Sequence, residues 1–592
     1  MLGVRSAQYG LLEADYLYRD FVGRETFYGF LAAMRGQLFK DEEFAKLYCG
    51  DNGRDSVPPS MLATALLLQT HDKVSDEEAK ERAAFDIRWK VALGVGIEEK
   101  PFAKSTLQLF RAHLILHEKI RAVFQRSLRF AKETGYLKGH RMKAAIDTTF
   151  ILGRGAVKDT YNLLADGIML LVRALAEIDG MEAQTWAEQH GLGRYFGSSI
   201  KGDSAVDWDD EKARNVFLQG IVADADRLLE LARQAQAGEP EESDGRKHIV
   251  AAANLLGQLL LQDVERKEEG AVLKQGVSRD RIVSVHDPEM RHGRKSSRNR
   301  FDGHKAAVLL DTDSQLITAA DMLPGNAHDH TGAVEMVKQS EENTGIGVEA
   351  TIGDAAYGDG ATRQAFVDAE RTLVAKVPGR PSKAFFPKED FKIDLQARTC
   401  TCPSGQVTNA VRRTLKSRTD GQGRWQRFEG FIFDAVVCAT CELRSRCIAS
   451  KKGKGRTVTL HPQEALLQQA RALQHSEAFG EYKKRRQVSE HRIARLVQLG
   501  IRQARYFSRA KTRFQLLVAA TVANLTLVAT AVGMMGKPHR DAISSVVGFC
   551  QRITTGANAI TVRVSGFLAR TRAFLVFQSQ PLARTGGFRP DF

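Results

Sequence analysis

The sequence lacks features that mark secreted and repeat proteins. Its first residues, MLGVRSAQYGLLEADY, hold no apolar run, so we expect no secretory signal. No segment recurs at a fixed period, so a repeat architecture is not expected. Cysteine is scarce and odd in number, with seven in 592 residues, five of them within 400–447. This argues against a secreted disulfide framework and favours a reducing cytoplasm.

Long hydrophobic runs are also rare. The run at 516–536, LLVAATVANLTLVATAVGMMG, is long enough to span a bilayer. It is rich in Ala and Thr, contains Asn524 and follows a strongly cationic segment. We therefore expect a buried core helix here, and no membrane partner.

The composition is that of a globular protein with a basic surplus. Hydrophobic residues make up 43% and charged residues 27% of the chain, which excludes a disordered protein. The length is too great for one core and predicts about three to four compact units. A net charge of +15 and a pI near 9.4 favour a polyanionic partner.

Residues 1–140 are expected to be helical. A capping box at 75–78 predicts a helix to about residue 93, and Ser105–Gln108 opens another that runs to about 131. A Pro-led stretch before them starts a third helix. Short helices with Arg and Lys suit a domain that contacts DNA ends, although they suit other helical domains as well.

The middle of the chain reads as an α/β core with insertions. A strand is expected at 144–152, and a helical block at 160–270 interrupts it before strand character resumes. The further strands are expected at 281–285, 304–312, 315–322, 349–354 and 372–377, with a helix from about 360. Strands followed by strand–helix–strand predict a mixed sheet.

Two carboxylates stand at the ends of apolar strands. Asp147 lies within AAIDTTFIL, and Asp354 ends EATIGD before a glycine-rich turn. A buried, unpaired carboxylate costs several kcal/mol, so each needs a cation, donors or a metal. Taken alone, Asp147 could also be a strand-end residue that caps a turn. As a pair on one sheet, the two acids could converge on a single cation.

The segment 481–513 is the most basic in the chain, with eleven Lys or Arg against two Glu. On a helix, Glu490 shares an arc of about 80° with apolar Ile493 and Val497, which predicts that it faces the protein. The alternative is a solvated basic helix in which Glu490 pairs with Arg486. Tyr506 and Phe507, set among cations, could stack on exposed bases.

Four stretches together resemble bacterial insertion-sequence transposases of the DDE type. They are IDTTFILGRGAVKDTYNLL, DPEMRHGRKSSRNRFDGHKAAVLLDTDSQLITAADMLPGNAHD, TIGDAAYGDG and RRQVSEHRIARLVQLGIRQARYFSRAKTRFQLLVAATVANL. Order, spacing and flanking residues all agree with the family. The resemblance implies an RNase H-like core and a bacterial, cytoplasmic, nucleoid-associated enzyme that acts on double-stranded DNA as a homo-oligomer.

The resemblance also implies a catalytic triad. Asp147, Asp354 and Glu490 correspond to the family acids that bind two Mg²⁺ ions, for which Mn²⁺ is a substitute. The family signature around the Glu is Tyr, two residues, Arg, three residues, Glu, six residues, Lys. Here three residues instead of two separate Tyr482 from Arg486, and Val497 replaces the Lys. Glu481 and Glu429 therefore remain alternatives for the third acid.

Metal chemistry explains the residue types. Two cations about 4 Å apart can hold the attacking and leaving oxygens of an in-line phosphoryl transfer. Carboxylates suit Mg²⁺, which keeps several waters and accepts phosphate oxygens. In such a reaction water frees a 3′-hydroxyl at the element's end, and that hydroxyl then attacks target DNA.

A second ligand set is sulfur-based. Cys402, Cys438, Cys441 and Cys447 form a C…C-x₂-C-x₅-C pattern, with Cys400 as an alternative first ligand. This pattern resembles a structural Zn²⁺ site. Reduced cysteines without metal, or a redox pair, are the alternatives. His328, Asp329 and His330 could also form a metal triad, but we expect a loop that could border the active site.

Cations cluster in two segments that we predict to bind DNA. The first is a basic loop at 291–305, and the second is the segment that carries Glu490. The predicted DNA-binding residues are Arg291, Arg294, Lys295, Arg298, Arg300, Lys305, Arg485, Arg486, Arg492, Arg495, Arg502, Arg505, Arg509 and Lys511.

The sequence thus predicts an α/β protein with an RNase H-like mixed-sheet catalytic core, a helical N-terminal domain, and helical and cysteine-containing insertions. The expected ranges are 1–140 for the helical domain, 141–535 for the core, 160–270 and 385–460 for the insertions, and 536–592 for a basic tail. The expected function is Mg²⁺-dependent DNA cleavage and strand transfer. A nuclease of the same fold and a catalytically inactive DNA-binding derivative remain alternatives.

Overall fold

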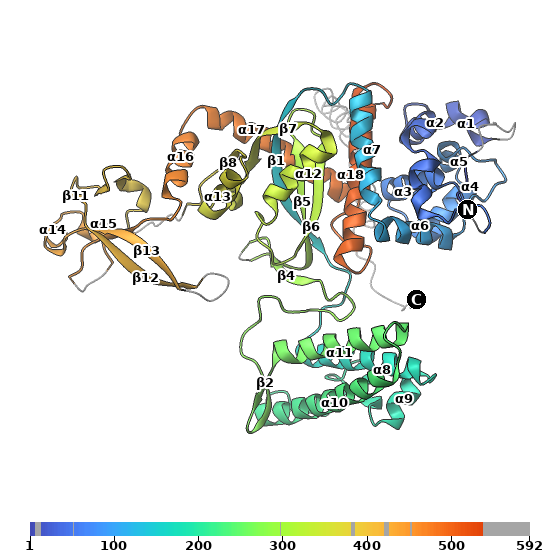
Figure 1. Ribbon diagram of the computed structural model, residues 1–592, viewed down its shortest axis with the longest axis horizontal. Coiled ribbons are helices and arrows are strands. Elements are labelled where there is room, and N and C mark those ends of the chain that lie inside the picture. Colours follow the sequence, from blue (N-terminus) through green and yellow to red (C-terminus); the bar gives the residue numbers. More distant parts are fainter. Residues whose placement is uncertain are drawn as a thin grey trace, which may run out of the picture. The chain divides into compact units, whose positions relative to one another are not determined.

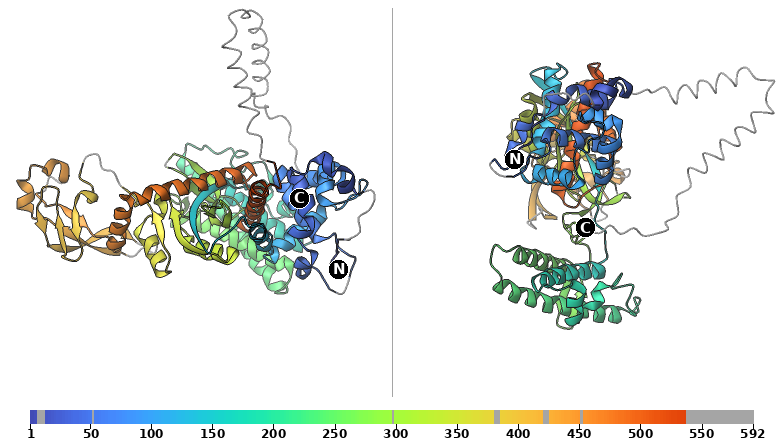
Figure 2. Two further views of the ribbon diagram at one scale, coloured as in Figure 1. Left: turned by 90° about the horizontal axis from the view of Figure 1, so that it is seen from above. Right: turned by 90° about the vertical axis from the view of Figure 1, so that its right-hand side faces the viewer.

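A computed structural model gives the architecture (Figures 1 and 2). It describes residues 1–5, 13–50, 53–296, 298–379, 385–419, 425–449 and 453–536. The tail expected at 536–592 falls outside these ranges from residue 537 onward, as does Cys550.

The N-terminal region is helical, as the sequence predicts. Its elements are α1 (Ala14–Val22), α2 (Phe27–Leu38), η1 (Asp41–Leu47), α3 (Pro59–Asp72), α4 (Asp76–Phe85), α5 (Ile87–Leu93), α6 (Lys104–Leu116) and α7 (Ile120–Glu133). Ser75 caps α4, because its side chain accepts from the Glu78 amide. The second half of the predicted capping box is not seen, since the Glu78 carboxylate pairs with Arg82. Two predicted helices are each broken in two. Asp86 caps α5 and so separates it from α4. The second predicted helix begins at Lys104 without a side-chain cap and is divided into α6 and α7.

A mixed six-stranded sheet forms the central layer. Its strands are β1 (Arg141–Leu152), β4 (Arg291–Arg294), β5 (Arg300–Asp311), β6 (Ile317–Pro324), β7 (Gly347–Gly353) and β8 (Leu373–Ala375). β1 pairs antiparallel with β5 and parallel with β7, and β6 and β8 extend the two sides. Helices α12 (Ala333–Thr344) and α13 (Gly360–Asp368) join the later strands, with η3 (Ala355–Tyr357) between β7 and α13. The mixed α/β class and the helical N-terminal region are confirmed.

Two strand-level predictions are wrong. Residues 281–285 form no strand, although Val283 and Val285 are buried. The basic stretch 291–305 is a β-hairpin, since β4 pairs with the start of β5. Gly303 has φ +150°, and a Cβ there would lie 2.2 Å from the Ile151 carbonyl oxygen, so only glycine lets the hairpin pass so close to β1.

The helical block after β1 has its own hydrophobic core. It contains α8 (Thr160–Ile178), α9 (Ala183–Gln189), η2 (Gly193–Phe196), α10 (Glu211–Gly238), α11 (Asp244–Asp263) and the hairpin of β2 (Val264–Lys267) and β3 (Gly270–Leu273). Tyr161, Trp186 and Leu256 are among the apolar residues buried within it. Because this core is separate from that of the sheet, the block reads as a self-contained insertion.

The cysteine-containing segment is made of short strands and helices. They are η4 (Lys388–Asp390), β9 (Lys392–Asp394), β10 (Thr399–Thr401), β11 (Val407–Thr408), β12 (Val411–Thr419), β13 (Trp425–Ile432), α14 (Ala435–Ala439), α15 (Arg444–Cys447) and β14 (Thr457–Thr459). It buries a small core that includes Phe391, Cys400, Phe431 and Cys447. α16 (Glu464–Gln474) follows and leads back to the sheet.

The last two described helices complete the core. α17 (Ala478–Gln498) is one long helix that passes β1, β5 and β7 (Figure 2). α18 (Arg509–Ala531) contacts α3, α7 and β6. Within the described ranges, α18 is the one helix long and apolar enough to cross a membrane, but 78% of its apolar window is buried inside the protein. The expectation of a core helix is therefore confirmed.

A buried amide fixes α18 against the sheet. Asn524 donates to the Ile317 carbonyl (2.8 Å) and accepts from the Ile317 amide (2.9 Å). Ile317 begins β6, where the register with β5 shifts. A buried backbone group without a partner would cost about 1–3 kcal/mol. The Asn524 side chain avoids this cost by bonding the amide and carbonyl of Ile317, as a neighbouring strand would.

Candidate active site

Strand register brings two of the predicted acids together. β1 pairs in parallel with β7, with Ala145 opposite Ile352, so Asp147 and Asp354 stand at the same level, two residues further on. β7 ends at Gly353, and the chain then turns away at η3. Asp354 caps that turn by accepting from the Ala356 amide at 2.8 Å. The end of β7 thus exposes one side of β1 at Asp147.

α17 supplies the third predicted acid. Asp147, Asp354 and Glu490 line one cleft of about 740 Å³. Ser489 donates to Asp147 Oδ2 at 3.1 Å and so fixes the helix against the strand. Arg486 Nη1 lies 3.6 Å from Asp147 Oδ2, and its Nη2 lies 3.2 Å from Glu490 Oε1. One guanidinium therefore bridges two acids that are 343 positions apart in the chain.

The orientation predicted for Glu490 is wrong in one respect. The buried residues of α17 near it are Ser489, Arg492 and Leu496, whereas the Glu490 side chain is 63% exposed. Ile493 and Val497, on the same stripe as Glu490, line the cleft with it. The stripe faces the cleft because the neighbouring stripe, about 100° around the helix, packs on the core.

The alternative acids lie elsewhere. Glu481 is exposed and pairs with Lys484 at 2.9 Å. Glu429 is on β13 and lies 3.5 Å from Arg398 and 3.6 Å from Arg413. Neither lines the cleft.

Electrostatics in the cleft favour a cation. Burial, and then the charge of Asp354, raise the pKa of Asp147, while the Thr148 amide, Ser489 and Arg486 act in the opposite direction. Tyr357, fully buried just after Asp354, has a pKa raised well above its usual value, first by burial and then by the charges of Asp147, Asp329 and Asp354. Sequence reasoning missed Ser489 and Tyr357, because a single hydroxyl residue forms no recognisable pattern.

The three acids fit a metal ion by their chemistry but not by their present arrangement. Among the described residues, no group of three or more His, Cys, Asp or Glu side chains is arranged to hold a metal ion. The three acids share a cleft and are hard oxygen donors, so their chemistry fits Mg²⁺. Their side chains must still converge, and Glu490 is the exposed, movable member.

The loop after β6 borders the cleft. Lys305 donates to Asp329 at 2.8 Å, and both residues line the cleft. His330 lies 3.3 Å from Asp359, and its ring stacks on His328. The loop prediction therefore describes this segment better than the metal triad.

The predicted DNA-binding residues divide by exposure. Arg294, Lys295, Lys305 and Arg502 line the cleft with the acids. Arg298 and Arg300 are exposed on the hairpin, and Lys511 is exposed at the start of α18. Arg502 also stacks on Phe150, with 3.9 Å between guanidinium and ring centroid.

The remaining cations have protein partners. Arg291 donates to the Met290 carbonyl, Arg495 to Gln498, Arg485 to Thr312, Arg505 to the Val74 carbonyl, and Arg509 to Glu289. Arg492 is 7% exposed and donates to the Ala523 carbonyl of α18, and burial lowers its pKa to about 10. Its assignment as a DNA contact is wrong, since a helix covers it. Tyr506 is likewise packed against the core and not free to stack on bases.

Four of the five clustered cysteines lie around one small cavity. Cys402, Cys438, Cys441 and Cys447 line a small cavity of about 30 Å³. Cys400 does not line it, and burial raises the pKa of its thiol to about 11. As they lie, the four thiols are not arranged to hold a metal ion within the described part of the chain. The set fits zinc in identity and number.

The sequence models of two known families match parts of the chain. The sequence model of a family described as "Transposase DDE domain" matches residues 401–529. A second, described as "Transposase domain (DUF772)", matches residues 18–113. The first match spans Glu490 and the four cysteines, and the second covers the N-terminal helices α2–α5. No curated protein matches the chain.

Proposed function

We propose that the chain is a transposase of the DDE type, as the two family models that match parts of it indicate, and that it cleaves DNA at the ends of an insertion sequence and joins the freed 3′-hydroxyl to target DNA. One observation carries the proposal. Asp147, Asp354 and Glu490, which come from three separate segments, line a single cleft that cations also line. A carboxylate cluster beside cations suits phosphoryl transfer on a polyanion.

The roles of the residues follow from their positions. Asp147, Asp354 and Glu490 would hold two Mg²⁺ ions, with Mn²⁺ as a substitute, which supply charge stabilisation to the attacking and leaving oxygens. Ser489 holds the Asp147 carboxylate in place by its hydrogen bond. Arg486 balances the charge of Asp147 and Glu490 and would shift toward a phosphate as Glu490 turns inward.

DNA would lie across the cleft. Arg294, Lys295, Lys305 and Arg502 would contact phosphates next to the acids, and the exposed hairpin residues would extend this contact along the duplex. Residues 1–140 would bind the element ends, and a homo-oligomer would bring two ends together. The site of action would be the bacterial cytoplasm, at the nucleoid.

A structural Zn²⁺ ion would hold the insertion 385–460 together. Cys402, Cys438, Cys441 and Cys447 line one cavity, which supports a four-thiolate site without an open position. Such a site would have no part in the chemical step.

Cleavage of end DNA tests the proposal. We expect Mg²⁺-dependent cleavage by the wild type, and a loss of about a thousandfold or more in Asp147→Asn, Asp354→Asn and Glu490→Gln, each with DNA binding retained. Glu481→Gln, a matched change on the same helix, should cleave normally. If Glu481→Gln is inactive and Glu490→Gln active, the third acid is Glu481.

Strand transfer separates the remaining functions. A protein that cuts end DNA but never joins it to a target is a nuclease of the same fold. A protein that binds ends and neither cuts nor joins is a DNA-binding derivative of a transposase. Either result would overturn the proposed reaction.

A further inference from the structure

The loop at 499–508, between α17 and α18, touches the active site on one side. Its backbone pairs with the end of β1, because the Leu152 amide donates to the Arg502 carbonyl (2.9 Å) and the Ala504 amide to the Leu152 carbonyl (2.8 Å). Gln503 adds a side-chain bond to the Gly153 carbonyl at 2.8 Å. The loop is thus an extra strand segment beside the strand that carries Asp147.

The same loop is held by α18. Gln515 accepts from the Arg505 amide at 2.9 Å and donates to the carbonyls of Gly500 and Gln503 at 3.2 and 3.0 Å. Gln515 is itself only 7% exposed. One buried side-chain amide therefore bonds three points of the loop.

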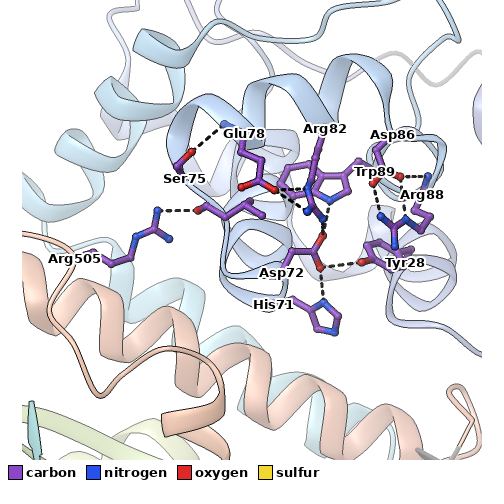
Figure 3. Close-up of polar contacts among 11 residues, drawn as sticks. Tyr28, His71, Asp72, Ser75, Glu78, Arg82, Asp86, Arg88, Trp89 and Arg505 are labelled. Atoms are coloured by element: carbon purple, nitrogen blue, oxygen red, sulfur yellow. Dashed lines mark hydrogen bonds and ion pairs between the residues drawn. The ribbon is translucent and has the colours of Figure 1, made fainter. Parts of the chain in front are cut away.

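On its other side the loop reaches the N-terminal helices. Arg505 Nη2 donates to the Val74 carbonyl at 2.8 Å; Figure 3 labels Arg505 and draws this contact as a dashed line. Val74 lies in the turn between α3 and α4, where Lys73 has φ 59° and Ser75 caps α4. Val74 is 3% exposed, so the carbonyl that receives Arg505 is part of a fixed turn.

That turn is rigid for a clear reason. Asp72, the last residue of α3, accepts hydrogen bonds from Tyr28 (2.8 Å), Trp89 (2.8 Å) and Arg82 (2.9 Å), all labelled in Figure 3. These donors come from α2, α5 and α4. Four helices are therefore tied to the residue two positions before the Arg505 contact.

A second contact runs in parallel. The Arg111 guanidinium of α6 lies 5.0 Å from the Tyr506 ring centroid. Arg111 is buried and bonds both carboxylate oxygens of Asp76, at 2.6 and 3.1 Å. Asp76 is the first residue of α4, so Tyr506 also meets the α3–α4 turn region, through Arg111.

We propose that Arg505 and Tyr506 are positioning residues that make the geometry of the cleft depend on the N-terminal helices. They link the α3–α4 turn to the loop, and the loop continues α17, which carries Glu490, and pairs with β1, which carries Asp147. DNA bound by the N-terminal helices therefore changes the relative positions of Asp147 and Glu490 to those needed for cleavage. This inference rests on the proposed function. It gives Arg505 a role in coupling, whereas its charge alone would suggest a DNA contact.

The test compares Arg505→Ala and Tyr506→Leu with the wild type. On end DNA, we expect kcat for cleavage to fall about tenfold or more while KM stays the same. Mn²⁺-dependent nicking of an unrelated duplex, which does not need end recognition, should not change. Arg505→Lys, which can still donate to Val74, and Tyr506→Phe, which keeps the ring over Arg111, should recover most of the rate.

Two controls separate coupling from folding and from simple loss of charge. Arg233→Ala, on an exposed arginine of α10 that pairs with Glu230, also removes one positive charge and should leave both rates unchanged. Equal losses of end cleavage and unrelated nicking in Arg505→Ala would indicate a merely structural role and overturn the inference. Unchanged kcat in both Arg505→Ala and Tyr506→Leu would overturn it as well.

Hydrogen exchange tests the coupling without cleavage. End DNA should slow amide exchange at 499–508 in the wild type but not in Arg505→Ala. If the wild type binds ends and these amides do not respond, the coupling is absent. If they respond but no DNA is cut, the proposed reaction fails and the coupling stands.

Discussion

The Ser489 hydroxyl lies 3.1 Å from Asp147 Oδ2, and this bond joins the helix of Glu490 to the strand of Asp147. Ser489 is fully buried, and its single hydroxyl proton is shared between Asp147 and the Arg486 carbonyl, which lies 2.8 Å away. We expect Ser489→Ala to lower the cleavage rate by up to about tenfold, the worth of one hydrogen bond, with little change in Tm. Single-turnover cleavage and thermal unfolding measure the two effects. A rate equal to that of the wild type would mean that packing alone holds the helix.

Exposed and buried cations should differ in their salt response. Lys295→Ala removes an exposed charge at the cleft, so the slope of log Kd against log salt should fall by about one unit. Arg492→Met removes a charge that is covered by α18, so that slope should not change. DNA binding titrated at several salt concentrations checks both. A reduced slope for Arg492→Met would contradict its burial.

Two tyrosines allow a matched test of stability. The Tyr357 hydroxyl is buried and finds no hydrogen-bond partner among the described residues, whereas Tyr28 donates to Asp72 at 2.8 Å. Tyr28→Phe should therefore cost about 1 kcal/mol in free energy of unfolding, and Tyr357→Phe should cost nothing or stabilise the protein. Denaturant unfolding of the two variants measures both free energies of unfolding. A loss in Tyr357→Phe as large as in Tyr28→Phe would reveal a bond to bound water.

The hydrogen bonds and ion pairs of Asp72 predict a pH dependence. They lower its pKa from 3.8 to about 2 even though burial acts in the opposite direction. A lowered folded-state pKa stabilises the protein above the unfolded value, and this stabilisation is lost as the pH falls from about 4 to about 2. The shift corresponds to roughly 2 kcal/mol. Asp72→Asn should thus destabilise the fold at pH 6 and approach the wild type near pH 2, as measured by denaturant unfolding. A pH-independent difference would contradict the assignment.

The cysteine cavity predicts which thiols matter for zinc. The purified protein should contain about one Zn²⁺ per chain, and Cys441→Ser should lose it. Cys400→Ser is the matched control, because Cys400 lies outside the cavity. Elemental analysis measures the metal. Loss of zinc in Cys400→Ser would move the first ligand from Cys402 to Cys400, and absence of zinc in the wild type would leave reduced cysteines.

The sequence by itself determined most of the strands that carry the candidate acids and suggested that two of these acids could converge. Apolar, β-branched runs around Asp147 and before Asp354 predict strands that carry these carboxylates. The structure adds that the two strands pair in parallel, with Asp147 inside β1 and Asp354 just after β7. The apolar run at 516–536 is predicted to be a core helix because it is rich in Ala and Thr, contains the polar Asn524 and follows a cationic segment. These features are local, so periodicity and residue type are sufficient to find them.

Only the tertiary structure decided which face of each element is covered. Periodicity defines the stripes of α17, but packing on the sheet and on α18 buries Ser489, Arg492 and Leu496 and leaves Glu490 at the cleft. In the same way, Cys402 and Cys400 are equivalent by spacing, and the short strands of the insertion turn only Cys402 toward the other thiols. Arg505 looks like a DNA contact by charge, yet a turn some 430 residues earlier accepts its hydrogen bond. Contacts between distant segments depend on the whole fold, and for that reason no local pattern predicts them.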